Sequence, residues 1–291
     1  VRESVKAGLN QVDAISMVSK NCFDYYNMGK DLGGIAPGKL ADILVFDDLN
    51  KLKPNKVFIG GRLVVSNGSI VSKIKKYTIP KWMTKTIKLK KITENDFLVR
   101  SKSDSVNVNV IDMKTEIVTE KSSESLSVYN GNVLASHDKD VWKVAAFDRT
   151  SGSTEHTVAF LKNFGAEIGA FASTWSFHEN DMIVIGSNEK DMAIAANHLA
   201  KTQGGMIVVN NGKILSFMPL QMAGIVSTDN FEKVTENFEN ISLVLNDRGC
   251  KFKKPHLIPL FLPFLALPSI RILFSGLIDV KTRSFLKVVT G

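Results

Sequence analysis

The stretch from Asp181 to Leu215 constrains the fold of this chain most, because its local sequence signals agree with one another. It begins with a short apolar run, Met182 to Ile185, that stops at Gly186. A run of this length without alternating polar residues is typical of a strand that is buried on both faces. The stretch is therefore expected to start with a fully buried strand.

A helix is expected directly after this strand. Ser187 and Asn188 are residue types that cap helix amino termini, and carboxylates follow in the first turn, where they favour the positive end of a helix. Gly204 and Gly205 predict the end of the helix. Apolar residues recur between these limits with the spacing of one helical face; they are Met192, Ala195, Ala196 and Leu199.

The stretch closes with two further strands. Met206 to Val209 is a second apolar run, and Asn211-Gly212 is a favoured pair for a two-residue hairpin turn into Lys213 to Phe217. The sequence thus predicts a unit of strand, helix, strand and hairpin. A polar cluster, Ser176 to Asp181, precedes this unit in an otherwise apolar context.

Composition bounds the class of protein. The chain has 291 residues, 44% hydrophobic and 23% charged, which is typical of a soluble globular protein of about two domains. Cys22 and Cys250 are the only cysteines and lack CxxC spacing, so we expect a reducing cytoplasm and neither a disulfide framework nor a thiolate metal site. The first residues lack an apolar signal segment and start inside a helical pattern, which indicates a fragment.

The first part of the chain predicts helices followed by a small β module. Apolar residues recur at helical spacing from Val5 to Phe23, with a break at Gly8 to Asn10. Turn residues then introduce a series of strands. These are expected at Ile43 to Phe46, Lys56 to Ile59, Arg62 to Val65 and, after an Asn67-Gly68 hairpin turn, Ser69 to Val71.

Residues 72–91 are dense in lysine and include Tyr77 and Trp82. Lysines with aromatic neighbours are one pattern for binding nucleic acid or an anionic surface. The other interpretation is a solvated connection, in which residues 86–92 alternate as a strand with the lysines outward. The net charge of +8 is moderate for this length, so composition favours the solvated connection and a nucleic-acid partner is not expected.

The second half of the chain predicts many strands and few helices. Helices are expected at Thr157 to Phe164 and at Phe231 to Phe238. His256 to Leu267 is apolar, but prolines interrupt it and it is too short to cross a membrane, so buried core or an interface is expected. The expected strands are Phe97 to Val99, Val106 to Ile111, Thr115 to Val118, Leu126 to Val128, Val133-Leu134 after an Asn130-Gly131 turn, Val141 to Phe147, Arg271 to Phe274 and Gly276 to Val280.

Two polar segments are candidates for function. The loop from Asp148 to His156 is rich in hydroxyl groups, so it is suited to hold a phosphate or a substrate amide, or it is a solvated turn. The cluster from Ser176 to Asp181 is either a substrate-facing loop or a polar loop in which Asp181 caps a turn. The remaining histidines are expected to be structural or solvated, since none has a second ligand type at useful spacing; they are His137, His198 and His256.

Several segments carry a resemblance to a known family. Gly33 to Leu49, GGIAPGKLADILVFDDL, resembles the segment after the last barrel helices of amidohydrolase-superfamily enzymes. Residues 168–215, which start with IGAFASTWSFHENDMIVIG, resemble the carboxy-terminal domain of bacterial adenine deaminases, as do MPLQMAGIVS at 218–227 and LPFLALPSIRILFSGLIDV at 262–280. The resemblance covers nearly the whole chain and is strongest from Asp148 onward.

The resemblance implies a mixed α+β fold in three parts. Residues 1–30 would be the last helices of a truncated (β/α)8 amidohydrolase barrel. Residues 31–92 would be a small β-sandwich segment with the basic linker. Residues 93–291 would be an α+β adenine-deaminase carboxy-terminal domain.

The resemblance also implies a hydrolase that converts adenine and water into hypoxanthine and ammonia, with Mn or Fe as its metal. The family's metal ligands are histidines and an aspartate on barrel strands that are absent from this sequence, so no metal ligand is expected here and the fragment should be inactive alone. The expected partners are a purine base, the missing amino-terminal barrel and further copies of the chain, without a membrane. The alternative is a non-catalytic binding or oligomerisation domain left by truncation.

The site residues that the resemblance implies lie in the two polar segments. The candidates for catalysis are His178, Glu179 and Asp181, and the candidates for substrate binding are Arg149, Ser153, Glu155, His156 and Asn180. The family usually reads His-Asp-Ser-His-Asn where this chain reads Phe-His-Glu-Asn-Asp, so Phe177 and Asn180 replace two histidines. If the loop touches substrate, the intact protein is expected to prefer another purine or to have lost deamination.

Overall fold

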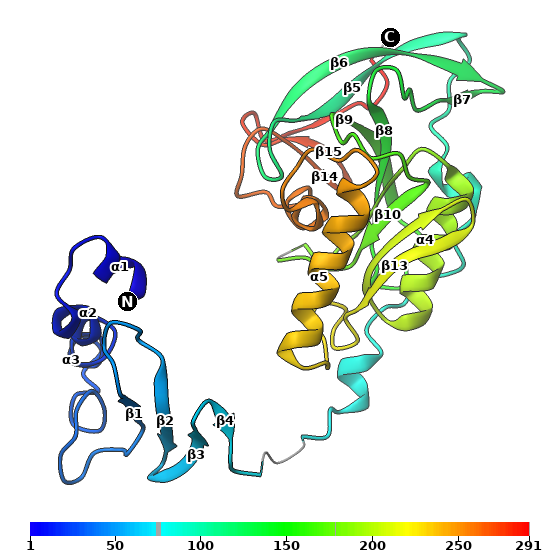
Figure 1. Cartoon of the computed structure of the whole chain (residues 1–291). Helices are drawn as coiled ribbons and strands as arrows, with labels where there is room; N and C mark the ends of the chain where they lie inside the picture. Colours follow the sequence, from blue (N-terminus) through cyan, green and yellow to red (C-terminus); the bar gives the residue numbers. More distant parts are fainter. Residues whose placement is uncertain (74–76, 178, 291) are drawn as a thin grey trace. The chain divides into compact units, whose positions relative to one another are not determined.

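Strand β10 (Ala170–Ser173) lies between β11 (Met182–Gly186) and β12 (Gly205–Asn210) and pairs antiparallel with both. The structure is a computed structural model and describes residues 1–73, 77–177 and 179–290. The chain divides into two compact units, Val1–Thr78 and Ile79–Gly291. Figure 1 colours both units from blue at the amino terminus to red at the carboxyl terminus.

The first unit contains short helices and a small antiparallel sheet. The helices are α1 (Arg2–Lys6), α2 (Gln11–Met17) and α3 (Lys20–Tyr25), and the strands are β1 (Ile43–Phe46), β2 (Pro54–Ile59), β3 (Arg62–Ser66) and β4 (Ser69–Ile70), in the order β1-β2-β3-β4. Asn67 and Gly68 both have positive φ in the turn between β3 and β4, as their hairpin geometry requires. The predicted β module is confirmed.

The second unit is built on a nine-stranded sheet. Its strand order is β13-β12-β10-β11-β8-β9-β5-β6-β7, and the described pairings are antiparallel except for β5 with β9. Besides β10, β11 and β12, this sheet contains β5 (Ser105–Met113), β6 (Thr119–Tyr129), β7 (Asn132–Val133), β8 (Val141–Phe147), β9 (His156–Lys162) and β13 (Lys213–Pro219).

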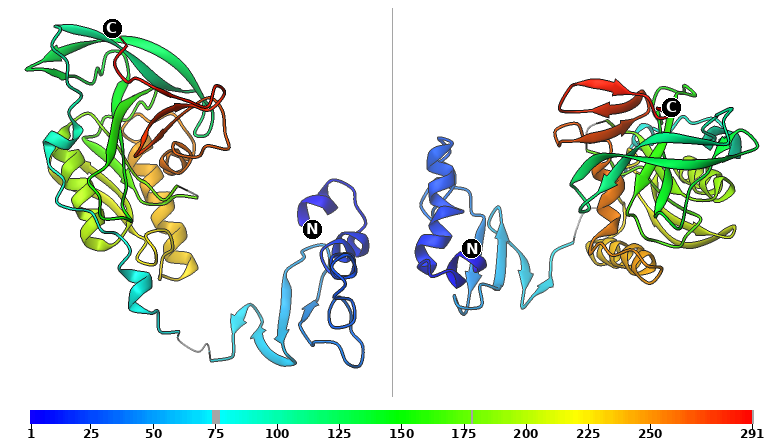
Figure 2. Two further views of the ribbon diagram at one scale, coloured as in Figure 1. Left: turned by 180° about the vertical axis from the view of Figure 1, so that it is seen from behind. Right: turned by 90° about the horizontal axis from the view of Figure 1, so that it is seen from above.

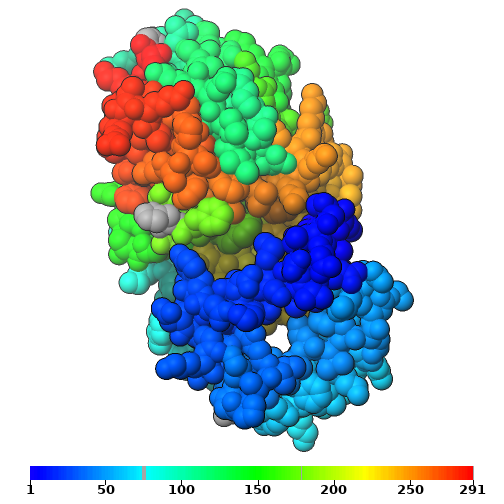
Figure 3. All heavy atoms as spheres, turned by 90° about the vertical axis from the view of Figure 1, so that its left-hand side faces the viewer, coloured from blue at the N-terminus to red at the C-terminus, as the bar shows by residue number. Residues whose placement is uncertain are grey.

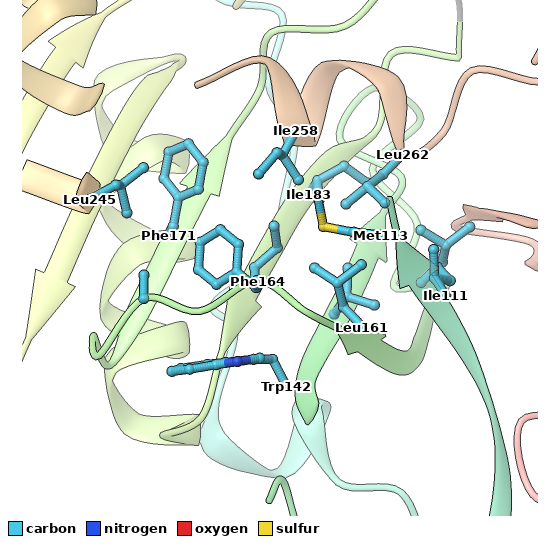
Figure 4. Packing of buried hydrophobic residues seen from close by; sticks show 14 of the residues in the cluster. Ile111, Met113, Trp142, Leu161, Phe164, Phe171, Ile183, Leu245, Ile258 and Leu262 are labelled. Atoms are coloured by element: carbon cyan, nitrogen blue, oxygen red, sulfur yellow. The ribbon is translucent and has the colours of Figure 1, made fainter. Parts of the chain in front are cut away.

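Helices cover both faces of the central strands (Figures 1 and 2). Along β11, Met182 and Val184 pack with α4 (Glu189–Thr202), whereas Ile183 and Ile185 pack in the cluster that includes α5 (Phe231–Asn246) and α6 (Ile258–Phe261). This alternation confirms the prediction of a strand buried on both faces. Figure 4 shows Phe164, Phe171 and Leu245 meeting in the core on the α5 side.

The second unit also contains a three-stranded sheet near the carboxyl terminus. It contains β14 (Ile270–Leu273), β15 (Gly276–Asp279) and β16 (Ser284–Leu286). β14 contacts β8 and β9. The orange and red surface of residues 270–286 adjoins green surface in Figure 3. The short 3-10 helices are η1 (Lys81–Thr84), η2 (Glu94–Phe97) and η3 (Pro255–Leu257).

The unit of strand, helix, strand and hairpin that the sequence predicts at Asp181 to Leu215 is confirmed. Asn188 is the N-cap of α4, and its side chain accepts a hydrogen bond from the Asp191 backbone N–H. The helix ends at Gln203, in a left-handed conformation just before the two glycines. Asn211 and Gly212 form the positive-φ turn between β12 and β13.

Some predicted elements are wrong. Residues 157–164 were expected to be helical, but most of them form β9, because β8 and β5 both offer backbone partners to an apolar run whose length suits either structure. Residues 86–92 are outside the sheets, although their lysines do point outward. The strand expected at Phe97 to Val99 begins in η2, and the strand expected at Thr115 to Val118 is a turn.

The helix expected at Phe231 to Phe238 is confirmed and continues to Asn246. Residues 256–267, which were expected to be buried or to form an interface, include the buried side chains of Ile258, Leu260 and Leu262. Among the residues that the structure describes, no helix is long and apolar enough to cross a membrane.

Candidate functional site

One end of the central sheet brings polar residues from both predicted segments together. Phe147 on β8 lies between its partners Met182 on β11 and His156 on β9. Asp181 directly precedes Met182, and Asp148 directly follows Phe147. The register of three neighbouring strands therefore places two carboxyl groups and an imidazole at the same edge.

The Asp148 carboxylate organises the hydroxyl-rich loop after β8. It accepts hydrogen bonds from the Thr150 N–H (2.9 Å), the Ser151 hydroxyl and the Ser153 Oγ (3.0 Å). Burial opposes ionisation of this carboxyl group, but the hydrogen bonds from Ser151, Thr150 and Ser153 outweigh it and hold the pKa of Asp148 below its usual value. The loop hydroxyls thus donate to the Asp148 carboxylate, and Ser153 takes part in this internal network.

Asp181 is the last residue of the second polar segment and is buried, with 2% of its surface exposed. Its Oδ2 accepts a hydrogen bond from the Phe274 N–H at 2.9 Å, in the turn between β14 and β15. Burial raises the pKa of Asp181 to about 7, and the negative charges of Glu179 and Asp148 act in the same direction. Asp181 is therefore a carboxyl group that exchanges its proton near neutral pH.

Arg149 is also buried, with 1% of its surface exposed. Its Nη1 donates to the Ala223 carbonyl oxygen at 3.1 Å, and its own carbonyl oxygen accepts from the Lys88 N–H at 2.9 Å. Burial lowers the pKa of Arg149 to about 10, although the nearby charge of Asp181 opposes the shift. The structure thus places Arg149 as a clamp between the loop around Ala223 and the extended segment around Lys88.

Glu155 and His156 complete the loop between β8 and β9. The Glu155 side chain is exposed, while its carbonyl oxygen accepts from the Asp148 N–H at 3.2 Å. The His156 ring stacks on Phe147 with a centroid distance of 4.9 Å, and its Nδ1 lies 2.9 Å from the Thr154 carbonyl oxygen. One face of the imidazole is therefore covered, and Glu155 is the member of the pair that faces solvent.

The loop from Phe177 to Asp181 carries the predicted catalytic candidates. His178 lies outside the described residues. Glu179 is half-buried and Asn180 is exposed with a left-handed backbone. The Asn180 N–H donates to Ser176 Oγ at 3.1 Å, so the loop turns back on itself before β11.

Phe177 is 56% exposed, and its ring lies beside those of Phe261 and Phe264, with centroid distances of 5.3 and 5.4 Å. The polar loop therefore begins on a small aromatic surface. The sequence could not indicate this contact, because Phe177 is far along the chain from Phe261 and Phe264.

Sequence reasoning also missed the residues that support the site. Thr174 is completely buried; its hydroxyl donates to the Gly224 carbonyl oxygen at 2.6 Å and accepts from the Gly205 N–H at 2.9 Å. Phe274 supplies the backbone N–H that meets Asp181. Hydrogen bonds to backbone groups cannot be predicted from side-chain types. The apolar residues around Thr174 in the sequence were the one indication that its hydroxyl is buried and bonded.

The three other histidines pack against aromatic rings. His137 lies against Trp142, His198 against Phe217 and His256 against Phe238. His256 Nδ1 is also 2.7 Å from the Ser242 hydroxyl. Within the described ranges, no group of three or more His, Cys, Asp or Glu side chains is arranged to hold a metal ion, so these residues do not fit the metal that the resemblance implies.

Two protein-family models match this chain. A model of the amidohydrolase family matches residues 1–64, and a model of the adenine deaminase C-terminal domain matches residues 116–284. The second match covers more than half of the mixed α+β chain. The chain belongs to the adenine deaminase C-terminal domain family, which confirms the resemblance seen in the sequence.

Relatives match along the whole chain. An adenine deaminase of Cenarchaeum symbiosum (strain A) is 53% identical over 291 residues, which are 100% of this chain and 48% of the relative. An adenine deaminase of Clostridium botulinum (strain 657 / Type Ba4) is 33% identical over 99% of this chain and 49% of its own length. One of Moorella thermoacetica is 30% identical over 100% of this chain and 50% of its own length. The chain thus spans about half the length of the curated relatives it matches.

Proposed function

We propose that this chain acts as part of an adenine deaminase, which converts adenine and water into hypoxanthine and ammonia. The observation that carries this proposal is the 53% identity to an adenine deaminase across all 291 residues. Identity at this level over both units supports a relationship that extends along the whole chain and is not limited to one domain. The reaction would return a purine base to salvage in the cytoplasm.

The proposed architecture assigns residues 1–30 to the last helices of a (β/α)8 barrel, residues 31–92 to a small β-sandwich segment with a linker, and residues 93–291 to the carboxy-terminal domain. The Mn or Fe would be bound by barrel residues outside this chain, and we assign the described residues no step that involves the metal. The amino-terminal barrel is the proposed partner, and the protein would assemble as a homo-oligomer. This chain alone would release no ammonia.

Within this enzyme we propose that the loop from Phe177 to Asp181 faces the purine. Adenine presents ring nitrogens that accept hydrogen bonds and an amino group that donates them. Glu179 and Asn180 carry the matching carboxylate and amide and lie on the side of the loop that is not fully buried. Asp181, beneath them, would hold the loop through Phe274 and keep a proton available near neutral pH.

The loop between β8 and β9 is the second proposed contact. Glu155 faces solvent, and His156 and Ser153 are partly exposed at the same edge of the sheet as Asp181. Arg149 would act indirectly, because its guanidinium is buried against Ala223 and Gly224. A substrate site at this edge would therefore consist of two loops supported by a rigid sheet.

Ammonia release from adenine by the complete gene product, loaded with Mn²⁺ or Fe²⁺, tests this proposal. We expect Glu179→Gln and Asn180→Ala each to lower kcat/KM by about tenfold or more, because each removes a polar contact to the base. Asp138→Asn, in an exposed turn, is the matched control and should leave kcat/KM unchanged.

The outcomes separate the deaminase from its alternative. A complete, metal-loaded protein that releases no ammonia from adenine or any other aminopurine would contradict the deaminase proposal and favour a non-catalytic binding or oligomerisation domain. Activity on an aminopurine other than adenine would keep the reaction class and correct the substrate. Full activity in the Glu179 and Asn180 variants would remove the loop from the site while leaving the reaction in place.

A further inference from the structure

The lysine-rich segment from Ile79 to Ile92 belongs to the second unit. The side-chain amide of Gln203 accepts from the Ile87 N–H at 3.0 Å and donates to the Ile87 carbonyl oxygen at 3.1 Å. The Asn197 amide does the same at Ile92, at 3.0 and 2.7 Å. Two amides of α4 and its C-cap therefore clamp this segment along the helix, where the cyan ribbon runs beside α4 in Figure 2.

This clamp sets the direction of the lysines. Ile87 and Ile92 are buried and Leu89 is half-buried, so the intervening side chains must face water. Lys88 and Lys90 are exposed and two residues apart, which in extended chain places them on one side about 7 Å from each other. The backbone that carries the positive charges is thus ordered before any partner arrives.

Helix α4 adds further lysines to the same surface. Lys190, Ile194, Asn197 and Lys201 fall at i, i+4, i+7 and i+11, which is one stripe of the helix. Lys190, Lys201 and Lys91 line a groove of about 680 Å³ between this stripe and residues 91–95. Ile92, Ala193 and Ile194 form part of its apolar floor, and Glu94 is the acidic side chain in its lining.

Among the residues that the structure describes, the lysines of this surface take part in no ion pair. We name the exposed lysines Lys85, Lys88, Lys90, Lys91, Lys190 and Lys201 the α4 ridge. Within the described residues, ion pairs occur at other lysines, such as Lys114, Lys162 and Lys233, and none involves the α4 ridge. Six lysines beside a groove whose lining holds one acidic side chain, Glu94, leave an excess of positive charge, which favours an anionic partner whose charges are regularly spaced.

An exposed aromatic side chain lies at one end of the ridge. Trp82 in η1 is 73% exposed and is followed three residues later by Lys85. η1 itself is held to the second unit, since the Met83 carbonyl oxygen accepts from the Ala223 N–H. A basic track that ends in an exposed indole is the combination by which proteins bind single strands, with phosphates on the lysines and a base stacked on the ring.

We propose that the α4 ridge and Trp82 bind single-stranded nucleic acid. The lysines neutralise the phosphodiester backbone without reading its sequence, and Trp82 stacks on an unpaired base. This binding is separate from the proposed deaminase reaction, because it uses a different surface and needs neither the purine site nor a metal.

Fluorescence anisotropy of the whole chain with a labelled oligothymidylate of about 20 nucleotides tests the proposal. Four or five phosphate contacts predict a slope of log affinity against log salt of about −3, at roughly 0.7 per contact on single strands. Lys88→Gln/Lys90→Gln should make the slope shallower by about 1.4. Trp82→Ala should weaken binding by about tenfold with little change in the slope, because it removes stacking and no charge.

A matched control and two other ligands make the test decisive. Lys251 and Lys253 are also exposed, two residues apart and in the second unit, so Lys251→Gln/Lys253→Gln should leave affinity and slope unchanged. A duplex of the same length should bind more weakly than the single strand. Absence of oligonucleotide binding at low salt, equal losses in the control variant, or binding to phosphatidylserine vesicles without binding to the oligonucleotide would each overturn the proposal.

Discussion

The two units of the chain differ sharply in how much apolar surface they bury. In the described part of the first unit, Ala14 is the one hydrophobic residue that is buried, whereas the second unit holds three clusters of buried side chains. The first unit also leaves large apolar side chains exposed, among them Val12, Tyr25, Tyr26 and Ile35. The hydrophobic core of the described chain therefore lies almost entirely in the second unit.

The physical consequence concerns stability. Burial of apolar surface is the main favourable term in folding, and a unit in whose described part the one fully buried hydrophobic residue is an alanine gains little of it to offset the loss of chain entropy. The first unit has an apolar cavity of about 710 Å³ between its helices and its sheet, lined by residues such as Ile15, Phe23 and Leu44. Its helices and strands therefore need further apolar partners, in line with the proposed barrel.

Separate expression of the two units gives the largest test of this contrast. Residues 79–291 should unfold in one cooperative transition, because their core is complete. Residues 1–78 should show no cooperative transition. Thermal unfolding followed by circular dichroism measures both, and limited proteolysis of the whole chain provides the control, since cleavage should remove the first unit before the second. A cooperative transition in the isolated first unit would contradict the burial argument.

Aromatic residues in the two units should respond very differently to truncation. Phe164 is completely buried against Trp142 and Phe171, so Phe164→Ala should lower the free energy of unfolding by about 3–5 kcal/mol. Tyr25 is 81% exposed, so Tyr25→Ala should change it by less than about 0.5 kcal/mol. Urea unfolding of the whole chain measures both variants. A large loss with Tyr25→Ala would show that the first unit contributes to the cooperative core.

The sequence predicted the parts of the fold that local chemistry determines. Asn188, Asn211 and Gly212 each act through neighbouring backbone, and the cap and the hairpin turn were found where these residues predicted them. Residues 157–164 were mistaken for a helix, because an apolar run does not reveal whether strand partners exist elsewhere in the chain.

The candidate site shows the same limit. The two polar segments were recognisable by their residue types, but the strand register that joins Asp148, Asp181 and His156 is a property of the sheet. The amides that bind Ile87 and Ile92 belong to Gln203 and Asn197, which lie more than a hundred residues away along the chain. Backbone partners at long range are invisible in sequence.

Within the second unit, Asp181 and Asp148 are neighbouring carboxyl groups whose stability should depend on pH with opposite signs. Burial raises the pKa of Asp181 from 3.8 to about 7, so the folded state holds a proton that the unfolded state has lost. Its contribution to stability is complete below about pH 4 and is lost as the pH rises through 7. The free energy of unfolding of Asp181→Asn, relative to that of the wild type, should therefore increase by about 2–4 kcal/mol from pH 4 to pH 8.

Asp148 provides the matched comparison. Despite its burial, hydrogen bonds from Ser151, Thr150 and Ser153 lower its pKa, so its contribution is present above the usual pKa near 3.8 and is lost on acidification. Asp148→Asn should be destabilising at neutral pH, and the loss should shrink below about pH 4. Urea unfolding across this pH range measures both variants. Parallel pH profiles for the two would contradict the opposite environments assigned to them.

The smallest expected effect compares two glycines of the second unit that share a backbone conformation. Gly224 and Gly212 have φ of +72° and +75°, so alanine meets the same left-handed strain at both, about 1–2 kcal/mol. A Cβ at Gly212 would meet open space, whereas one at Gly224 would lie 2.7 Å from Nη1 of the buried Arg149. Gly224→Ala should therefore cost about 1–3 kcal/mol more than Gly212→Ala in urea unfolding. Equal costs would mean that Arg149 moves aside freely and does not clamp the loop around Ala223.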